Sequence, residues 1–349
     1  MFSTLTGNER AKEILRRMKK ARRVPGALLF AGEEGVGKRL FALELAKALN
    51  CRQPSEQEAC DACPSCTRIM EFVLPAADDR DAHKKIIWSA HPDVGLARAY
   101  NRAIPVDAMR DLEREANFRP YEGHARVFLV EDAEKLNEAS SNALLKTLEE
   151  PPPTSHIILL TSRPAMLLPT IRSRCQAVRF SPLAPAEIEA YLLKDKKKKL
   201  SAEDARLLAH AARGSIGRAL TCDLESYLER REAMLDVLGA LALDSDRVRL
   251  LRASEEMTDA KRKDEYEPRL DVLATLIHDA WALRLDAPAT KLTHPDLSAR
   301  LKKIAARLTS RRAARLLSQI EAHRANLEVN INRKVSTDAL FLAMSQTND

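Results

Sequence analysis

Aromatic residues are scarce in this chain of 349 residues, where they make up only 4%. That scarcity argues against a surface that stacks the bases of single-stranded nucleic acid. Long hydrophobic runs are also missing, and the longest, residues 234–243, is too short to span a bilayer. The opening residues, Met1 to Lys12, are polar and charged, which predicts no secretory signal. We therefore expect a cytoplasmic protein with no membrane association.

The composition is that of a folded globular protein. Hydrophobic residues make up 45% of the chain and charged residues 31%, a balance that argues against intrinsic disorder. The chain is long enough for two or three domains, each with its own core. The net charge of +7 permits contact with nucleic acid but does not demand it.

One helical segment near the start, with the turn after it, is densely basic. Its cations are Arg16, Arg17, Lys19, Lys20, Arg22 and Arg23. A run of this kind is typical of a solvated helix face. A patch that contacts phosphates is the alternative interpretation.

A glycine-rich loop organises the first part of the chain. An apolar run over residues 27–31 predicts a buried strand, and residues 40–49 predict a helix. The loop between them contains Gly32, Gly35, Gly37 and Lys38. Strand, glycine loop, lysine and helix form the P-loop layout, in which backbone N–H groups and the helix N-terminus hold phosphates. The alternative is a glycine turn that binds nothing.

Two features depart from a working P-loop ATPase. The residue after the lysine should carry a hydroxyl that ligates Mg²⁺, and here it is Arg39, a cation. A second buried strand ends in Glu131 and Asp132, at a place where such enzymes direct carboxylates toward Mg²⁺ and water. The order Glu–Asp shifts both carboxylates relative to the metal. A capped turn into the next helix is the alternative.

Four of the six cysteines fall within residues 51–66. They are Cys51, Cys60, Cys63 and Cys66. Cys-x2-Cys turns let two thiolates converge on one ion, and four sulfurs complete a tetrahedral structural zinc site. Such a cluster suits a reducing compartment better than disulfides do. Iron–sulfur ligation uses similar spacing and is the alternative; we favour zinc because no Cys-Pro closes the run.

Strands and helices alternate over the first 180 residues. Helices are expected at residues 8–20, 40–49, 106–117 and 137–150. Strands are expected at residues 27–31, 85–88, 93–96, 126–132, 156–160 and 176–180. This alternation predicts an α/β fold with a parallel sheet covered on both faces. Ser181 to Pro185 is expected to form a hinge, after which only helices are expected, with Lys196–Lys199 as a solvated helix end.

Several stretches together resemble the clamp-loader branch of the AAA+ ATPases. They are residues 5–9, the P-loop at 32–38, the four cysteines, residues 142–152, Ser173-Arg174-Cys175, residues 214–220, Asn326-Leu327 and Asn330-Ile331-Asn332. The resemblance covers essentially the whole chain and is strongest in residues 1–220. It implies an AAA+ nucleotide-fold domain with a zinc module over residues 1–181, a helical lid over 182–223 and a helical collar for oligomerisation over 224–349.

The departures indicate which type of subunit this chain resembles. Motor subunits of that family, such as gamma/tau, carry a hydroxyl after the P-loop lysine and an Asp-Glu pair. A chain with Arg39 and Glu131 is similar to the subunit type that binds or hydrolyses ATP poorly. The resemblance implies that Arg174, preceded by Ser173, serves as an arginine finger for ATP held by a neighbouring subunit. A surface salt bridge is the alternative.

The resemblance also implies a set of partners and a function. Thr161 and Arg218 would belong to the degenerate nucleotide site, where bound ATP is doubtful. The chain would assemble with gamma/tau and delta subunits of DNA polymerase III, a DNA-directed DNA polymerase and thus a nucleotidyltransferase complex. Through that hetero-oligomer it would help place a sliding clamp on primed DNA without being catalytic alone. The alternatives are an ATP-hydrolysing motor subunit of the same complex and a stand-alone DNA-binding or repair factor.

Overall fold

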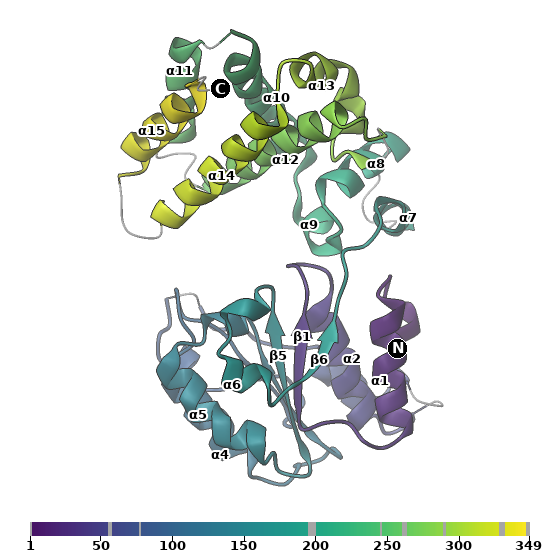
Figure 1. Ribbon diagram of the computed structural model, residues 1–349. Helices are drawn as coiled ribbons and strands as arrows, with labels where there is room; N and C mark the ends of the chain where they lie inside the picture. Colours follow the sequence, from purple (N-terminus) through teal and green to yellow (C-terminus); the bar gives the residue numbers. More distant parts are fainter. Residues whose placement is uncertain are drawn as a thin grey trace. The chain divides into compact units, whose positions relative to one another are not determined.

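A computed structural model describes residues 2–54, 58–76, 78–194, 200–244, 246–259, 264–288, 291–327 and 332–346. The chain divides into two compact units (Figure 1). The first comprises Met1–Lys198 with Gly214–Leu220, and the second comprises Lys199–Arg213 with Thr221–Asp349. The division into three domains stays a prediction. The expected helix end at Lys196–Lys199 and the motif residues Asn330 and Ile331 lie outside the described residues.

The first unit contains a six-stranded sheet in the order β2-β3-β4-β5-β1-β6. Its strands are β1 (Ala27–Ala31), β2 (Ile87–Trp88), β3 (Val94–Ala97), β4 (Arg126–Val130), β5 (Ser155–Thr161) and β6 (Gln176–Arg179). In this spatial order, β3, β4, β5, β1 and β6 each run parallel to the next strand. Ala27 of β1 lies opposite Ile157 of β5, and Leu28 of β1 lies opposite Gln176 of β6. Their carboxyl ends therefore meet at one edge of the sheet, where the P-loop, Glu131 and Thr161 lie. The predicted α/β class is confirmed.

One strand differs from the predicted parallel sheet. β2 runs antiparallel to β3, with Ile87 opposite Leu96, so the sheet is mixed. Only residues 89–93 join these two strands. A parallel pair needs a crossover connection of a dozen or more residues, and the short connection forces the chain to reverse instead.

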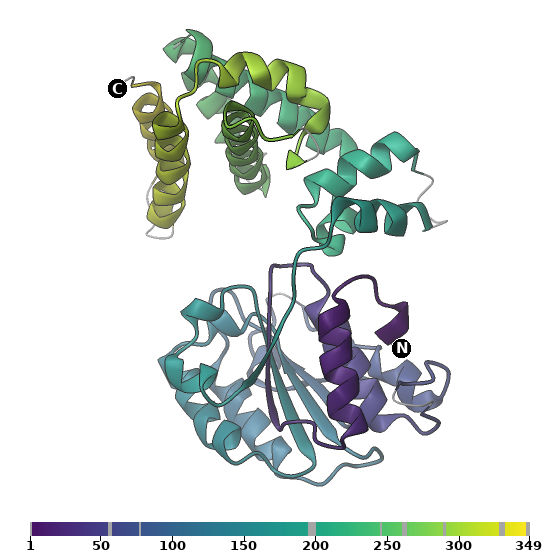
Figure 2. The same ribbon diagram turned by 45° about the vertical axis from the view of Figure 1, so that its right-hand side comes forward.

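Helices cover both faces of the sheet (Figures 1 and 2). Side chains alternate across a strand, so Leu28 and Phe30 of β1 join the core under α1 (Glu9–Lys20) and α2 (Lys38–Asn50). Leu29 of the same strand joins the opposite core. That core lies under α4 (Val106–Ala116) and α5 (Glu138–Glu149). The remaining helices of this unit are α3 (Pro64–Ile69), α6 (Pro169–Arg172), α7 (Pro185–Lys194) and α9 (Ile216–Thr221).

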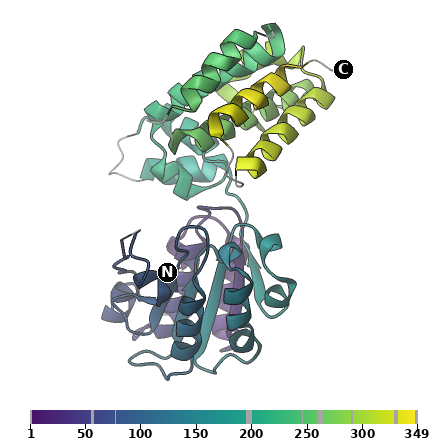
Figure 3. The same cartoon turned by 90° about the vertical axis from the view of Figure 1, so that its left-hand side faces the viewer.

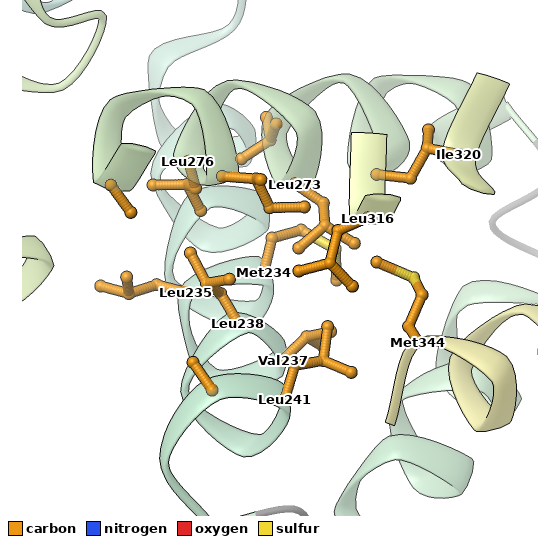
Figure 4. Close-up of a cluster of buried hydrophobic side chains, with 14 of the residues drawn as sticks. Met234, Leu235, Val237, Leu238, Leu241, Leu273, Leu276, Leu316, Ile320 and Met344 are labelled. Atoms are coloured by element: carbon orange, nitrogen blue, oxygen red, sulfur yellow. The ribbon is translucent and has the colours of Figure 1, made fainter. Parts of the chain in front are cut away.

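In the described residues of the second unit the regular elements are all helices (Figure 3). Its helices are α8 (Ala202–Ala211), α10 (Leu224–Gly239), α11 (Arg247–Met257), α12 (Tyr266–Arg284), α13 (Ser298–Ala305), α14 (Ser310–Leu327) and α15 (Arg333–Ser345). Helix α12 packs against α10, α13 and α14. Leu238 of α10, Leu273 of α12, Leu316 of α14 and Met344 of α15 lie in one cluster of buried side chains (Figure 4). Among the described residues, no helix combines the length and hydrophobicity that crossing a bilayer requires.

Candidate functional site

The predicted P-loop joins β1 to α2 at the carboxyl edge of the sheet. Gly35 and Gly37 have φ angles of 74° and 102°, in the left-handed region that glycine adopts without strain. Gly37 is the N-cap residue of α2, and Lys38 is its first residue. The glycines thus let the chain turn sharply from the strand into the helix.

The ammonium group of Lys38 is engaged by the loop itself. Its Nζ donates hydrogen bonds to the carbonyl oxygens of Gly32, at 2.6 Å, and Glu33, at 2.7 Å. Burial lowers the pKa of Lys38, while four nearby carboxylates, led by Glu134, act to raise it. A phosphate at this loop would have to compete with those two carbonyl groups for Lys38.

Arg39 and Glu131 meet where a P-loop ATPase would hold its metal. Arg39 Nε lies 3.1 Å from Glu131 Oε1, and Arg98 Nε lies 2.9 Å from Glu131 Oε2. The Arg39 guanidinium also lies 5.6 Å from the centroid of the Phe72 ring. Burial raises the pKa of Glu131, and the two arginines act to lower it. Both carboxylate oxygens are therefore paired with cations, which a divalent metal ion would have to displace.

The sequence reasoning did not identify Arg98, although this residue completes the ion pairs of Glu131. It also did not identify Glu134. Glu134 accepts hydrogen bonds from the hydroxyl and the backbone N–H of Ser162, just after β5. The available signal was a third acidic residue following the pair at the end of β4. Arg98 and Glu134 both act through contacts with residues distant in sequence. A local sequence pattern does not show such contacts.

Asp132 and Thr161 lie at the same edge of the sheet as Glu131. Asp132 adopts a left-handed conformation (φ 49°) and forms a 2.9 Å ion pair with Lys135. Thr161 is buried, and its hydroxyl accepts a hydrogen bond from the backbone N–H of Arg163 at 3.1 Å. Both side chains therefore already have partners within the chain.

A cavity of about 480 Å³ opens beside the P-loop, within the first unit. Its polar wall includes Lys38, Arg39, Glu131, Asp132 and Glu134. Its apolar wall includes Leu5, Leu40, Tyr191, Ile216 and Leu220. A cleft of this size, with apolar walls and a few polar groups, is typical of small-ligand sites.

Helix α9 lies against the P-loop. The backbone N–H of Gly217 donates to the carbonyl oxygen of Gly35 at 3.0 Å. A Cβ atom on Gly35 would lie 2.1 Å from the hydroxyl oxygen of Ser215, so only glycine fits this close approach. The backbone N–H of the half-buried Arg218 donates to that same hydroxyl. Among the described residues that line the cavity, α9 contributes Ile216, Gly217 and Leu220, and Arg218 is not one of them.

The four cysteine sulfurs converge as the spacing predicted. The Sγ atoms of Cys51, Cys60, Cys63 and Cys66 all lie within 4.8 Å of one another. Burial acts to raise the pKa of Cys63, but backbone N–H groups of Cys66 and Arg52 and neighbouring thiols lower it to about 6. Four convergent sulfurs with thiolate-stabilising N–H groups form a donor set that fits a tetrahedral zinc ion.

Arg174 lies just beyond α6 and contacts its own unit. Its Nε donates to Glu149 Oε1 at 2.7 Å, and its Nη2 donates to the same oxygen. Its Nη1 donates to the carbonyl oxygen of Thr170 at 2.9 Å, and the Ser173 hydroxyl donates to that carbonyl at 3.1 Å. The Arg174 side chain is 32% exposed. Within this chain Arg174 therefore forms an ion pair and remains partly exposed to solvent.

Comparison with known proteins covers nearly the whole chain. Residues 7–184 match the family model described as DNA polymerase III, delta subunit, and residues 225–343 match the model of its C-terminal part. DNA polymerase III subunit delta' of Bacillus subtilis is 27% identical over 93% of this chain and 92% of its own length. The Escherichia coli subunit delta' is 30% identical over 90% of this chain and 87% of its own. The E. coli subunit tau is 28% identical over 87% of this chain but only 47% of its own length.

Proposed function

This chain belongs to the DNA polymerase III delta-subunit family, and we propose that it acts as a delta'-type clamp-loader subunit. Relatives that carry the delta' name align over about nine-tenths of the chain. In this role it would help to place a sliding clamp on primed DNA during replication. Its partners would be gamma/tau and delta subunits in a hetero-oligomer, with the clamp and DNA reached through that complex. The cytoplasmic location stays a prediction.

The ion pairs around Glu131 carry the proposal that this subunit does not hydrolyse ATP. A motor subunit needs a hydroxyl after the P-loop lysine and a carboxylate available to Mg²⁺. Here Arg39 replaces the hydroxyl, and with Arg98 it occupies both oxygens of Glu131. The cavity still leaves room for a small ligand, so binding of a nucleotide without turnover is compatible with the site.

The similarity to tau makes a motor subunit the second candidate. That relative aligns with 87% of this chain, so overall likeness does not separate the two candidates. Arg39 favours one candidate over the other, because a guanidinium cannot replace a hydroxyl as a ligand of Mg²⁺. We therefore prefer the delta'-type role.

Arg174 is the residue that would act on ATP held by a neighbouring subunit. A guanidinium inserted from outside stabilises the negative charge that develops on the transferred phosphoryl group. The partly exposed side chain of Arg174, two residues beyond α6, supports this assignment. Because Arg174 would reach ATP only when subunits pack correctly, hydrolysis would be coupled to assembly.

The assignment of Arg174 is tested in the complex reconstituted with gamma/tau and delta partners. Arg174→Ala should leave assembly intact and lower DNA-stimulated ATP hydrolysis by about tenfold or more. Arg172→Ala is the matched control, because Arg172 is exposed and lies two positions away on α6. An unchanged hydrolysis rate in the Arg174→Ala complex would show that Arg174 is not the finger.

The cysteine cluster is proposed to hold a structural zinc ion. Cys51, Cys60, Cys63 and Cys66 would be its ligands, and the ion would contribute folding free energy to this segment. The Ser65 hydroxyl donates to the carbonyl oxygen of Asn50 at 2.8 Å, which fixes the cluster to the end of α2. A role in stability, remote from the P-loop chemistry, is therefore expected.

A further inference from the structure

Glu149 and Arg174 are brought together by the ends of two helices. Helix α5 ends at Glu149, before three consecutive prolines at residues 151–153 that cannot continue it. Helix α6 ends at Arg172, and the two helices pack against each other. The Glu149 side chain therefore extends from the last residue of α5, and the Arg174 side chain extends from a position two residues beyond α6.

The hydrogen bonds of Arg174 within the chain use three of the five N–H donors of its guanidinium. A guanidinium carries five N–H donors in a planar group. The Nε and Nη2 groups each donate to Glu149 Oε1, and Nη1 donates to the Thr170 carbonyl oxygen. Subtracting these three bonds from five leaves one N–H on Nη1 and one on Nη2. Those two donors remain available to the oxygens of a phosphate group.

We propose that Glu149 is a positioning residue that holds Arg174 with these two remaining N–H donors directed toward a neighbouring subunit's phosphoryl group. The inference rests on the proposed role of Arg174 and adds the residue through which that role is prepared. An arginine side chain is long and flexible, so fixing it in one conformation costs conformational entropy. If Glu149 orders Arg174 before the subunits dock, this entropy is not lost again on assembly. Arg174 would therefore be presented before the neighbouring subunit arrives.

A single oxygen of Glu149 accepts both hydrogen bonds from Arg174. A substitution can therefore keep these hydrogen bonds while it removes the negative charge. Because Oε1 alone accepts from Nε and Nη2, the amide oxygen of a glutamine can accept the same two N–H groups. Glu149→Gln should therefore preserve the orientation of Arg174 while removing the negative charge. Glu149→Ala removes both.

The experiment uses the complex reconstituted with gamma/tau and delta partners and measures DNA-stimulated ATP hydrolysis. Glu149→Ala should lower kcat by about tenfold, and Glu149→Gln should stay close to the unmodified complex. Glu150→Ala is the matched control, because Glu150 is the adjacent exposed carboxylate and should leave kcat unchanged. The proposal is contradicted if Glu149→Ala turns over normally or if Glu149→Gln falls as far as Glu149→Ala.

A double variant then tests whether Glu149 acts through Arg174. If it does, Glu149→Ala combined with Arg174→Ala should be no slower than Arg174→Ala alone. A further drop in the double variant would assign Glu149 a separate structural role and overturn the inference. An unaffected Arg174→Ala complex would refute the proposed finger itself, whereas a slow Arg174→Ala complex with a normal Glu149→Ala complex would refute only the positioning role.

Discussion

Arg39 and Glu131 form an ion pair, with 3.1 Å between Nε and Oε1, at the point where P-loop ATPases coordinate Mg²⁺. Arg98 pairs with the other oxygen of the same carboxylate at 2.9 Å. The strand, glycine loop and helix of a P-loop are present, and ion pairs engage both oxygens of Glu131. In the proposed function this loop supports structure, and the two arginines paired with Glu131 oppose coordination of a metal ion.

Replacing Arg39 with alanine should lower stability in a pH-dependent way. Burial raises the pKa of Glu131, so the folded chain binds a proton there more readily than the unfolded chain does. Ionising Glu131 therefore costs folding free energy, and Arg39 offsets part of that cost. Because the Arg39 side chain is 38% exposed, we expect Arg39→Ala to lower the free energy of unfolding by only about 1 kcal/mol at pH 7.

The loss of stability in Arg39→Ala should become smaller as the pH falls through the raised pKa of Glu131. Below that pKa the carboxyl group is neutral and no longer gains from an ion pair with Arg39. Denaturant unfolding at pH 7 and at about pH 4 measures the difference, with Arg39→Lys as the control that retains the charge. An equal deficit at both pH values would mean that Arg39 stabilises the fold through packing, for example on Phe72.

Removing the cysteine cluster should destabilise the first unit. Replacing Cys51, Cys60, Cys63 and Cys66 with serine should abolish bound zinc and lower the melting temperature, because structural zinc supplies folding free energy. Elemental analysis of the unmodified chain should find one zinc ion per chain. Cys222→Ser is the control, because Cys222 belongs to the second unit and is not a member of the cluster.

The structural zinc proposal has two distinct ways to fail. If the metal-free variant melted at the same temperature as the zinc-containing chain, the ion would have no structural role. If the purified chain showed a visible iron–sulfur absorption band, the cluster would be of the alternative type.

Local patterns in the sequence predicted much of this structure. The glycine spacing located the P-loop, and the apolar run at residues 27–31 located β1. Features that join distant segments were not predictable in this way. The contacts of Arg98 and Arg39 with Glu131 depend on how β3, α2 and β4 pack together. The pattern of hydrophobic residues along the sequence does not determine such side-chain pairings.

The reversal of β2 shows the same limit within the sheet. The apolar residues at 86–88 indicated a strand, but they contain no information on strand direction. The shortness of residues 89–93 was the available signal, because a chain of that length cannot cross over to run parallel. Connection length was therefore more informative about topology than the apolar pattern was.

The most direct test of the whole account is ATP turnover by the isolated chain in the presence of Mg²⁺. We predict no turnover above that of a Lys38→Ala variant, since Glu131 is paired with Arg39 and Arg98. Vigorous Mg²⁺-dependent hydrolysis that Lys38→Ala abolishes would contradict the account and identify the chain as a motor subunit.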